Sequence, residues 1–502
     1  MPPFSVRGMP MPCRFFVALA VLLAASMTSA VHADDDDTRF LLEQARRAAE
    51  RRAAPPDELI APPGSLVYEG RIYEVQTRLE ELEPAIYIAI NSGQWDRLAE
   101  LVGRYRMLRE HRPALADMAE ALLARQRGDH ALALRRMQAA HEADPVDVRI
   151  RLELARLRFE DNQDGAARAG FASVVAGGLP EAVQMMTQQY LLALDDRARW
   201  HGSIALGMGY NDNINQANGD YSCLFEWGGY CLFERRMPEP IGSDMVHYEL
   251  ALGRRIHLGG NHNLQIRPMA YGSHYRRNDG ADDAPIKDYS SNTTLLYLGY
   301  NWLDARNSIS ATPYVEHYYR NGHSQYLANG LQLEWRRMLG SRWQLGGSMD
   351  AKRYDHTSRG ARLAADYWQY QWGVSASYMP QASTTLYGGL DAVRKKYEVE
   401  QASSRELALR VGVYHVFDGS AGVFVNAMGI FRASRNDAFD GFLGERRRDL
   451  QQVYIVSAGV NAWKIAGMVP ELRVRHSINR SNLDWAFGFR QTEASLMLRH
   501  SF

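Results

Sequence analysis

The feature that most constrains the fold of this chain is a change of hydrophobic period near Trp200. Before this residue, apolar side chains recur at intervals of three and four, as on a helical face. Beyond it they alternate, as on a strand with one apolar and one polar face. In 246–258, for example, Val246, Tyr248 and Leu250 share one face, and His247 and Glu249 share the other. The sequence therefore predicts a helical domain over residues 65–199 and an all-β domain over residues 200–502.

The all-β part is expected to be a transmembrane β-barrel, although a soluble sandwich would alternate as well. Its alternating segments are often about 11–15 residues long, whereas sandwich strands usually have about five or six. Aromatic residues cluster near the segment ends, as in the interfacial girdles of outer-membrane barrels. The chain finishes on Phe502 after a run of alternating residues, which resembles the signal read by the outer-membrane barrel assembly machinery. Beyond the first thirty residues, no apolar run approaches the roughly 20 residues of a membrane helix.

The connections between these segments predict fourteen strands. Short turns fall near 259–262, 304–307, 339–342, 380–383, 418–421 and 464–468, and further connections near 211–243, 276–288, 320–324, 355–366, 398–403, 434–449 and 480–487. An even number of strands places both ends of the barrel on the same side of the membrane. Because the helical domain comes first, that side is expected to be the periplasm, with the generally longer loops outside.

The N-terminus is predicted to be a secretory signal peptide over residues 1–33. Arg7 and Arg14 lead into the apolar run 15–26, and cleavage is expected between Ala33 and Asp34. Residues 34–64 are expected to be a disordered arm and a Pro-rich linker. The mature chain is therefore expected to be an exported protein.

Export leaves two cysteines, Cys223 and Cys231. In an oxidising compartment, a spacing of eight residues favours one local disulfide over two free thiols. Two cysteines without histidines at useful spacing make a weak case for zinc.

The helical domain contains a repeat. Ala99, Ala133 and Ala167 are spaced by 34 residues, and Pro113 and Pro145 close successive units. This spacing resembles the tetratricopeptide repeat, although a generic array of helical hairpins is the alternative. Either arrangement gives a scaffold that binds a peptide or a protein surface. The residues expected to contact such a substrate are Met118, Leu122, Arg125, Leu152, Arg156 and Phe159; several of them, notably Leu122 and Leu152, could instead be core.

Alternation alone assigns a second set of residues to the barrel lumen: Glu249, Arg255, Asp350, Lys352, Glu406 and Arg410. Paired arginines in the predicted outer loops, such as Arg235 and Arg236, suit the phosphates of outer-membrane lipids or are ordinary solvated charges.

Composition and motifs exclude several functions. The chain has 58 basic and 58 acidic residues, so the basic footprint of a nucleic-acid binder is absent. No common hydrolase, zinc-protease or phosphate-binding motif occurs, and no cofactor or metal is expected. The Asx-rich stretch 211–215 lacks the Gly and the final Glu of a calcium loop, and self-capping Asx turns explain it better.

The domain order and the glycine-rich opening 202–215, which runs GSIALGMGYNDNIN, resemble the surface lipoprotein assembly modulators (Slam). The resemblance covers about residues 65–502 and implies a translocon without enzymatic activity. It would deliver surface lipoproteins, or soluble haem- or metal-scavenging proteins, from the periplasm to the cell surface. The implied partners are the client, outer-membrane lipids, the barrel assembly machinery and possible periplasmic chaperones. An exopolysaccharide exporter and a porin with a periplasmic scaffold are the competing interpretations.

Overall fold

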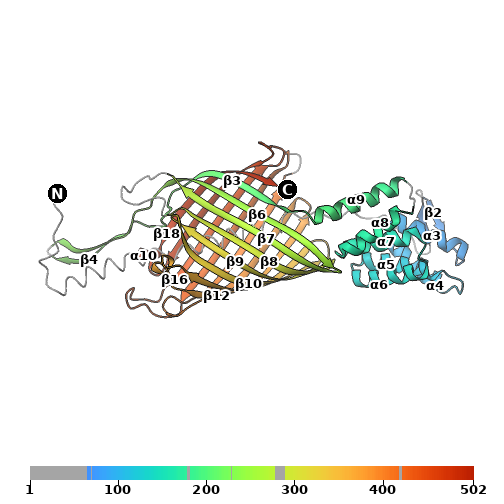
Figure 1. The fold of residues 1–502 in the computed structure, drawn as a ribbon, viewed down its shortest axis with the longest axis horizontal. Coiled ribbons are helices and arrows are strands. Elements are labelled where there is room, and N and C mark those ends of the chain that lie inside the picture. Colours follow the sequence, from blue (N-terminus) through green and yellow to red (C-terminus); the bar gives the residue numbers. More distant parts are fainter. Residues whose placement is uncertain (1–64, 69–70, 178–180, 228, 277–288, 418–420) are drawn as a thin grey trace.

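The computed structural model describes residues 65–502 apart from 69–70, 178–180, 228, 277–288 and 418–420 (Figure 1). The predicted signal peptide, its cleavage site between Ala33 and Asp34, and the arm and linker 34–64 lie outside the described residues. The predicted fold class is confirmed: helical repeats precede a closed β-barrel of fourteen antiparallel strands.

Antiparallel helix pairs build the N-terminal domain. The pairs are α3 (Leu79–Asn91) with α4 (Trp95–Arg106), α5 (Pro113–Gln126) with α6 (His130–Ala143), and α7 (Val148–Glu160) with α8 (Asp164–Val175), and the single helix α9 (Glu181–Arg197) follows them. Small residues allow close packing, and the repeat-spaced Ala133 and Ala167 are fully buried. Gly128 adopts a positive φ in the turn between α5 and α6, and Asp129 caps α6 by accepting a hydrogen bond from the Leu132 N–H. The 34-residue spacing therefore marks a packing position.

One segment departs from the predicted helical pattern. Residues at the start of the domain form an antiparallel hairpin of β1 (Ser65–Tyr68) and β2 (Arg71–Glu74). The sequence SLVY followed by RIYE is rich in β-branched and aromatic residues, which favour strands. Leu66 is buried in the helical core, so the hairpin covers the first end of the repeat array.

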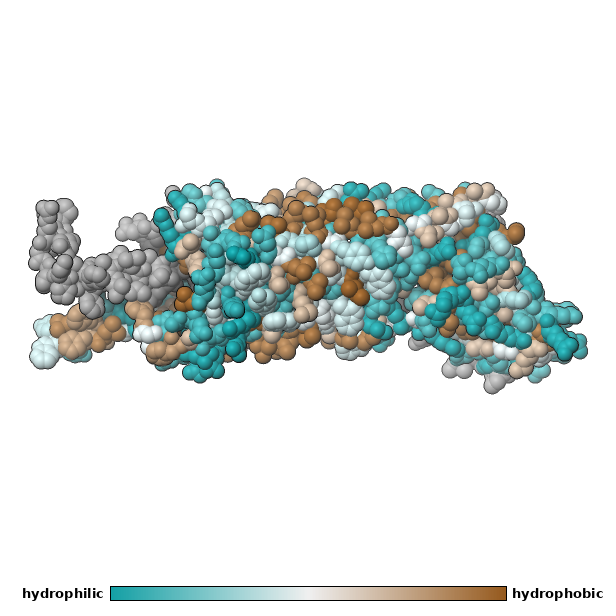
Figure 2. All heavy atoms as spheres, turned by 60° about the horizontal axis from the view of Figure 1, so that its bottom comes forward, coloured by the Kyte–Doolittle hydropathy of each residue, from teal (hydrophilic) through white to brown (hydrophobic). Residues whose placement is uncertain are grey.

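The barrel strands are β3 (His201–Asn211), β6 (Ser243–Gly259), β7 (His262–Tyr275), β8 (Ser291–Leu303), β9 (Asn307–Arg320), β10 (His323–Leu339), β11 (Trp343–His356), β12 (Tyr367–Gln381), β13 (Thr384–Tyr397), β14 (Ser404–Val416), β15 (Val423–Asn436), β16 (Arg448–Val460), β17 (Val469–Ser481) and β18 (Phe489–Ser501). Neighbours in sequence are neighbours in the barrel, and β18 pairs with β3 to close it. Alternate side chains point outward, and apolar residues gather over the middle of the barrel surface (Figure 2).

Each predicted turn or loop interval overlaps a connection between two barrel strands. The helical domain lies at one end of the barrel together with the C-terminus (Figure 1). The connection between β9 and β10 is much shorter than an outer loop usually is, because Asn321 and Gly322 both adopt positive φ values and form a two-residue hairpin turn. Short elements lie in two other connections: η3 (Gly360–Arg362) and α10 (Asp484–Phe487).

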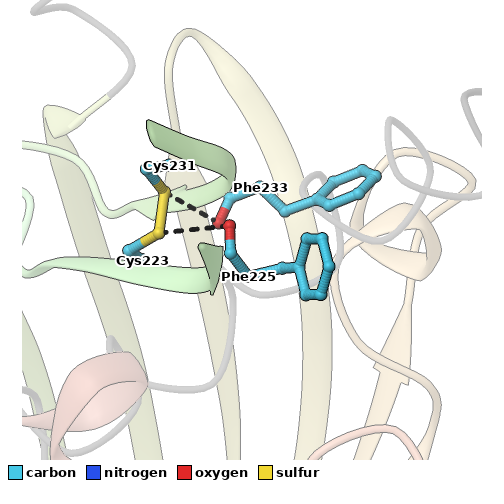
Figure 3. The surroundings of a disulfide bond; sticks show 4 residues. All are labelled: Cys223, Phe225, Cys231 and Phe233. Carbon is cyan, nitrogen blue, oxygen red and sulfur yellow. Dashed lines mark hydrogen bonds between the residues drawn. A yellow bond between two sulfur atoms is a disulfide. The ribbon is translucent and has the colours of Figure 1, made fainter. Parts of the chain in front are cut away.

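The longest described connection contains a sheet of its own. Strands β4 (Tyr221–Trp227) and β5 (Tyr230–Arg236) pair as an antiparallel hairpin that extends beyond the barrel end opposite the helical domain (Figure 1). The sequence predicted a connection here without strands. A disulfide joins Cys223 to Cys231 across the hairpin (Figure 3).

Candidate functional site

The six repeat-domain residues expected to contact a substrate are largely occupied in packing and ion pairing. Met118 is fully buried and Leu122 nearly so, within the main helical core. The prediction that these two residues face a substrate is therefore wrong, because the helix face chosen by spacing of three and four is the packed face of α5. Leu152 lies against a second cluster that contains Phe171.

Phe159 packs against the same second cluster. Its ring packs edge-on against Phe171 and Tyr190, with centroids 6.5 and 5.0 Å away. The guanidinium of Arg197 lies 3.7 Å above the same ring. This residue therefore helps to fix α9 against α7 and α8.

The two predicted contact arginines converge on one carboxylate. Arg125 donates to both oxygens of Glu160, at 2.7 and 2.6 Å, and Arg156 Nε lies 3.4 Å from Glu160 Oε1. Arg125 belongs to α5 and Glu160 to the end of α7, so this bidentate pair joins neighbouring repeats.

Apolar side chains that are exposed on the helical domain lie elsewhere. Val146, in the connection before α7, is 80% exposed, and Met185 and Leu192 on α9 are 59% and 54% exposed. Sequence spacing did not single them out, because α9 has no repeat partner and its weak periodicity gives no face.

A short turn of the helical domain docks onto two turns of the barrel. The turn between α7 and α8 contains Asp161 and Asn162, the latter with a positive φ. Asp161 accepts hydrogen bonds from the Asn261 side chain and, at 3.1 Å, from the Ala305 N–H. Asn162 donates to the Asp304 carbonyl oxygen at 3.1 Å. The β6–β7 and β8–β9 turns therefore form one platform for the repeats.

Arg255 belongs to this junction. It was expected to line the lumen, but its guanidinium pairs with Asp164 at the start of α8 and donates to Asn162. Next to it, the Gly165 N–H donates to His257 Nε2 at 3.2 Å. The expectation that Arg255 lines the lumen is therefore corrected. Its position on the strand does face inward, but it lies near the strand end, where a long side chain can reach the adjacent domain.

The other five residues assigned to the lumen lie on inward-facing positions and form ion pairs or hydrogen bonds. Lys352 on β11 reaches across β10 to Glu316 on β9 at 2.8 Å, and the Tyr314 hydroxyl donates to Asp350. On β14, Glu406 pairs with Lys395 at 2.9 Å and Arg410 pairs with Asp391 at 2.7 Å. Glu249 on β6 bonds Arg473 and Arg499. These charged side chains therefore connect nearby strands on the lumen side of the barrel wall.

A row of tyrosines also faces inward, near the barrel end away from the repeats. Ring contacts run in order through Tyr318, Tyr326, Tyr354, Tyr367 and Tyr397 on five successive strands, β9 to β13, with centroids 4.2–5.1 Å apart. Aromatic clustering at strand ends was interpreted as an interfacial girdle. For these tyrosines that interpretation is wrong. Leu327 and Trp368, which directly follow Tyr326 and Tyr367 in the chain, face outward, so the tyrosines face the lumen.

The outer end of the barrel carries the Asx-rich stretch and the disulfide hairpin. The Asn213 N–H donates to the Asn211 side chain at 3.0 Å, which is an Asx turn, as predicted. Figure 3 shows the disulfide on one side of the hairpin and the side chains of Phe225 and Phe233 beside each other. Arg235 stacks 3.8 Å from the Trp485 ring, which ties the hairpin base to α10.

Within the described residues, no group of three or more His, Cys, Asp or Glu side chains could hold a metal ion. Over the same part of the chain, no helix is both long and apolar enough to cross a membrane.

Comparison with known proteins decides the family. A model of surface lipoprotein assembly modifiers matches residues 200–502, which contain the whole barrel, and a model of the N-terminal TPR repeats of the same proteins matches residues 69–171. The chain belongs to the surface lipoprotein assembly modifier family. This is a family of assembly modifiers and not of enzymes, and the predicted resemblance to it is confirmed.

Relatives in this family match over most of their length. The hemophilin secretion modulator of Acinetobacter baumannii is 25% identical over 462 residues, covering 87% of this chain and 89% of that protein. Surface lipoprotein assembly modifier 1 of Neisseria meningitidis is 23% identical, covering 84% of each. Among solved structures, the outer membrane channel DcaP of Acinetobacter baumannii matches with a TM-score of 0.35 and 10% identity, covering 61% of this chain and 96% of that one.

Membership of the surface lipoprotein assembly modifier family orients the molecule. The barrel lies in the outer membrane of a Gram-negative cell, with the repeat domain in the periplasm. The docked α7–α8 turn is then at the periplasmic mouth, and the disulfide hairpin is at the cell surface.

Proposed function

We propose that this protein delivers surface lipoproteins, or related soluble haem- or metal-scavenging proteins, from the periplasm to the cell surface. The observation that carries the proposal is that both parts of the chain, in order, match the two parts of one family of assembly modifiers. The relatives are named for surface lipoprotein assembly and for hemophilin secretion.

The geometry supports a transport path without a covalent step. The repeat domain is docked at the periplasmic end of the barrel through Asp161, Asn162 and Asp164. A client held by the repeats is thereby brought to the barrel entrance. Exposed apolar side chains on α9, including Met185 and Leu192, suit contact with an incompletely folded client better than the six residues chosen by spacing.

Further partners belong to the same proposal. Outer-membrane lipids contact the apolar outer surface of the barrel, and Phe502 would be read by the barrel assembly machinery during insertion. Periplasmic chaperones would keep a client unfolded until the repeats bind it.

The test compares the native host with and without the gene. Intact cells are treated with protease, and the shaved peptides and the culture medium are analysed by mass spectrometry. We expect one or a few proteins to disappear from the surface or the medium while persisting in the periplasm. An unchanged protein profile would refute the proposal, and capsule export or solute uptake would then be measured to test for an exopolysaccharide exporter or a porin.

A further inference from the structure

The pairing of β3 with β18 differs from every other pairing in the described barrel. All other neighbouring barrel strands follow one another in sequence and share a connecting segment, whereas β3 and β18 are the first and last strands and share none. Two strands joined by a loop can part only by stretching that loop or by opening at the other end. The β3–β18 seam is thus the place where the wall can open along its whole length with the chain intact.

The lumen-facing side of β3 carries mainly very small side chains. Its inward positions on this ladder include Ser203, Ala205, Gly207 and Gly209, which are all small. In the register, Ala205 lies between Glu249 of β6 and Arg499 of β18. Side chains from the two neighbouring strands can therefore meet across β3 inside the barrel.

They do meet, and the contacts are ionic. Arg499 Nη2 donates to Glu249 Oε2 at 2.8 Å, directly over Ala205. Arg473 of β17 donates to the other oxygen of Glu249, and Arg499 Nε lies 3.2 Å from Glu471 Oε2. These four residues, Glu249, Glu471, Arg473 and Arg499, are named the seam clamp.

The next row of the seam shows how closely these strands are packed. His247 of β6 contacts Met497 of β18 across Gly207. A Cβ atom placed on Gly207 would lie 2.6 Å from His247 Nε2, so a larger residue at this position would displace the His247 and Met497 side chains from their contact. The absence of a side chain at Gly207 therefore leaves room for this contact across β3.

The outer side of the seam is apolar. Ile204, Leu206 and Met208 of β3 and Leu496 of β18 are exposed large hydrophobic side chains that point away from the lumen. On the lumen side, β18 carries Arg499, and the adjacent strands β6 and β17 carry the other charges of the clamp. An acyl chain inside this barrel would therefore lie against charged groups, whereas at the seam it would meet hydrocarbon.

We propose that the β3–β18 seam is the lateral exit through which the acylated end of a lipoprotein client reaches the outer leaflet, and that the seam clamp holds this exit closed from the lumen side. The proposal rests on the proposed function and adds the route and the closing device. Opening requires the Glu249 contacts with Arg473 and Arg499 to break while the β17–β18 and β3–β6 ladders remain intact.

The first experiment locks the seam in the full-length protein. Leu206 and Leu498 are directly opposed across the seam, and Leu206→Cys with Leu498→Cys would be oxidised to a disulfide in intact cells. The control pair is Leu390→Cys with Leu409→Cys, two leucines opposed across β13 and β14. The probe is the set of proteins whose shaved peptides vanish when the gene is deleted.

We expect the oxidised seam pair to reduce surface delivery of these proteins at least tenfold, with recovery on reduction, and the control pair to leave delivery within twofold of the native level. Undiminished delivery through an oxidised seam would overturn the lateral exit while leaving the proposed function intact. If the native protein itself delivers nothing, the proposed function fails and this inference fails with it.

A second measurement tests the clamp without cysteines. Glu249→Gln weakens it, and the matched variant is Glu316→Gln, which removes the partner of Lys352 in an ion pair that also crosses one strand, β10, but spans strands joined by loops. In purified full-length protein, we expect backbone amides of β3 and β18 to exchange with deuterium at least tenfold faster in the Glu249→Gln variant and at the native rate in the Glu316→Gln variant. Equal rates of deuterium exchange at the seam in the two variants would show that Glu249 does not hold the seam closed.

Discussion

At the scale of single residues, His130 is expected to make the repeat domain sensitive to acid. Burial lowers the pKa of His130; Glu160 opposes this effect and Arg306 adds to it. The folded state therefore takes up this proton less readily than the unfolded state, so stability falls as the pH drops through the unfolded value of about 6.5.

We expect His130→Gln to reduce the loss of thermal stability of the full-length protein between about pH 7.5 and about pH 5, the range that spans this titration. The measurement is the midpoint of helix loss by circular dichroism at each pH. His141→Gln, in the same helix, controls for the removal of a histidine. An equal acid loss in the native protein and the His130→Gln variant would contradict the prediction.

Arg125 allows a second test at this scale, because it was predicted as a substrate contact and is found as a bidentate partner of Glu160. Both side chains are partly buried, so removing either partner leaves the other charge poorly paired. We expect Arg125→Met and Glu160→Gln each to lower the unfolding free energy of the repeat domain by about 2 kcal/mol. If client delivery falls in Arg125→Met alone at equal stability, Arg125 contacts the client after all.

At the scale of elements, the hairpin of β4 and β5 is expected to depend on its disulfide, and the barrel is expected not to. Closing so short a loop removes unfolded-chain entropy worth about 2–3 kcal/mol to the hairpin. We expect Cys223→Ser with Cys231→Ser to speed protease cleavage within 221–236 at least tenfold, while the barrel keeps its heat-modified mobility on gels. Loss of barrel folding in this variant would show that the hairpin is part of the folding unit.

The docked α7–α8 turn is a second element with a measurable role. Arg255 is expected to fix the repeat domain through Asp164, so Arg255→Gln should broaden the distance distribution between spin labels at Ser92→Cys and Arg342→Cys in the two domains. Arg410→Gln removes a comparable ion pair within the barrel wall and should leave the distribution unchanged. A narrow distribution in the Arg255→Gln variant would mean that the remaining turn contacts suffice.

At the scale of the whole molecule, sequence periodicity predicted the fold better than it predicted the residues of the functional site. Alternation in segments such as 246–258 predicted the fourteen strands and their connections, because a membrane barrel requires opposite chemistry on its two faces. Spacing at three and four did not distinguish the packed face of α5, with Met118, from a binding face. The junction at Arg255 and the seam clamp at Glu249 join segments that are far apart in the chain. Local sequence patterns do not predict contacts of this kind.

The division of the molecule into two parts leads to the last prediction. The barrel closes on itself through its own ladders, and the repeat domain contacts it through one turn and a few side chains around Arg255 and Arg306. A chain with a signal peptide followed by residues 200–502 is therefore expected to insert into the outer membrane and to show the heat-modified mobility of a folded barrel. Without the repeats that bring a client to the entrance, we expect its surface delivery to fall to the level of the gene deletion. Delivery by the barrel alone would instead assign client recognition to the lumen and would leave the exposed face of α9 without a role in transport.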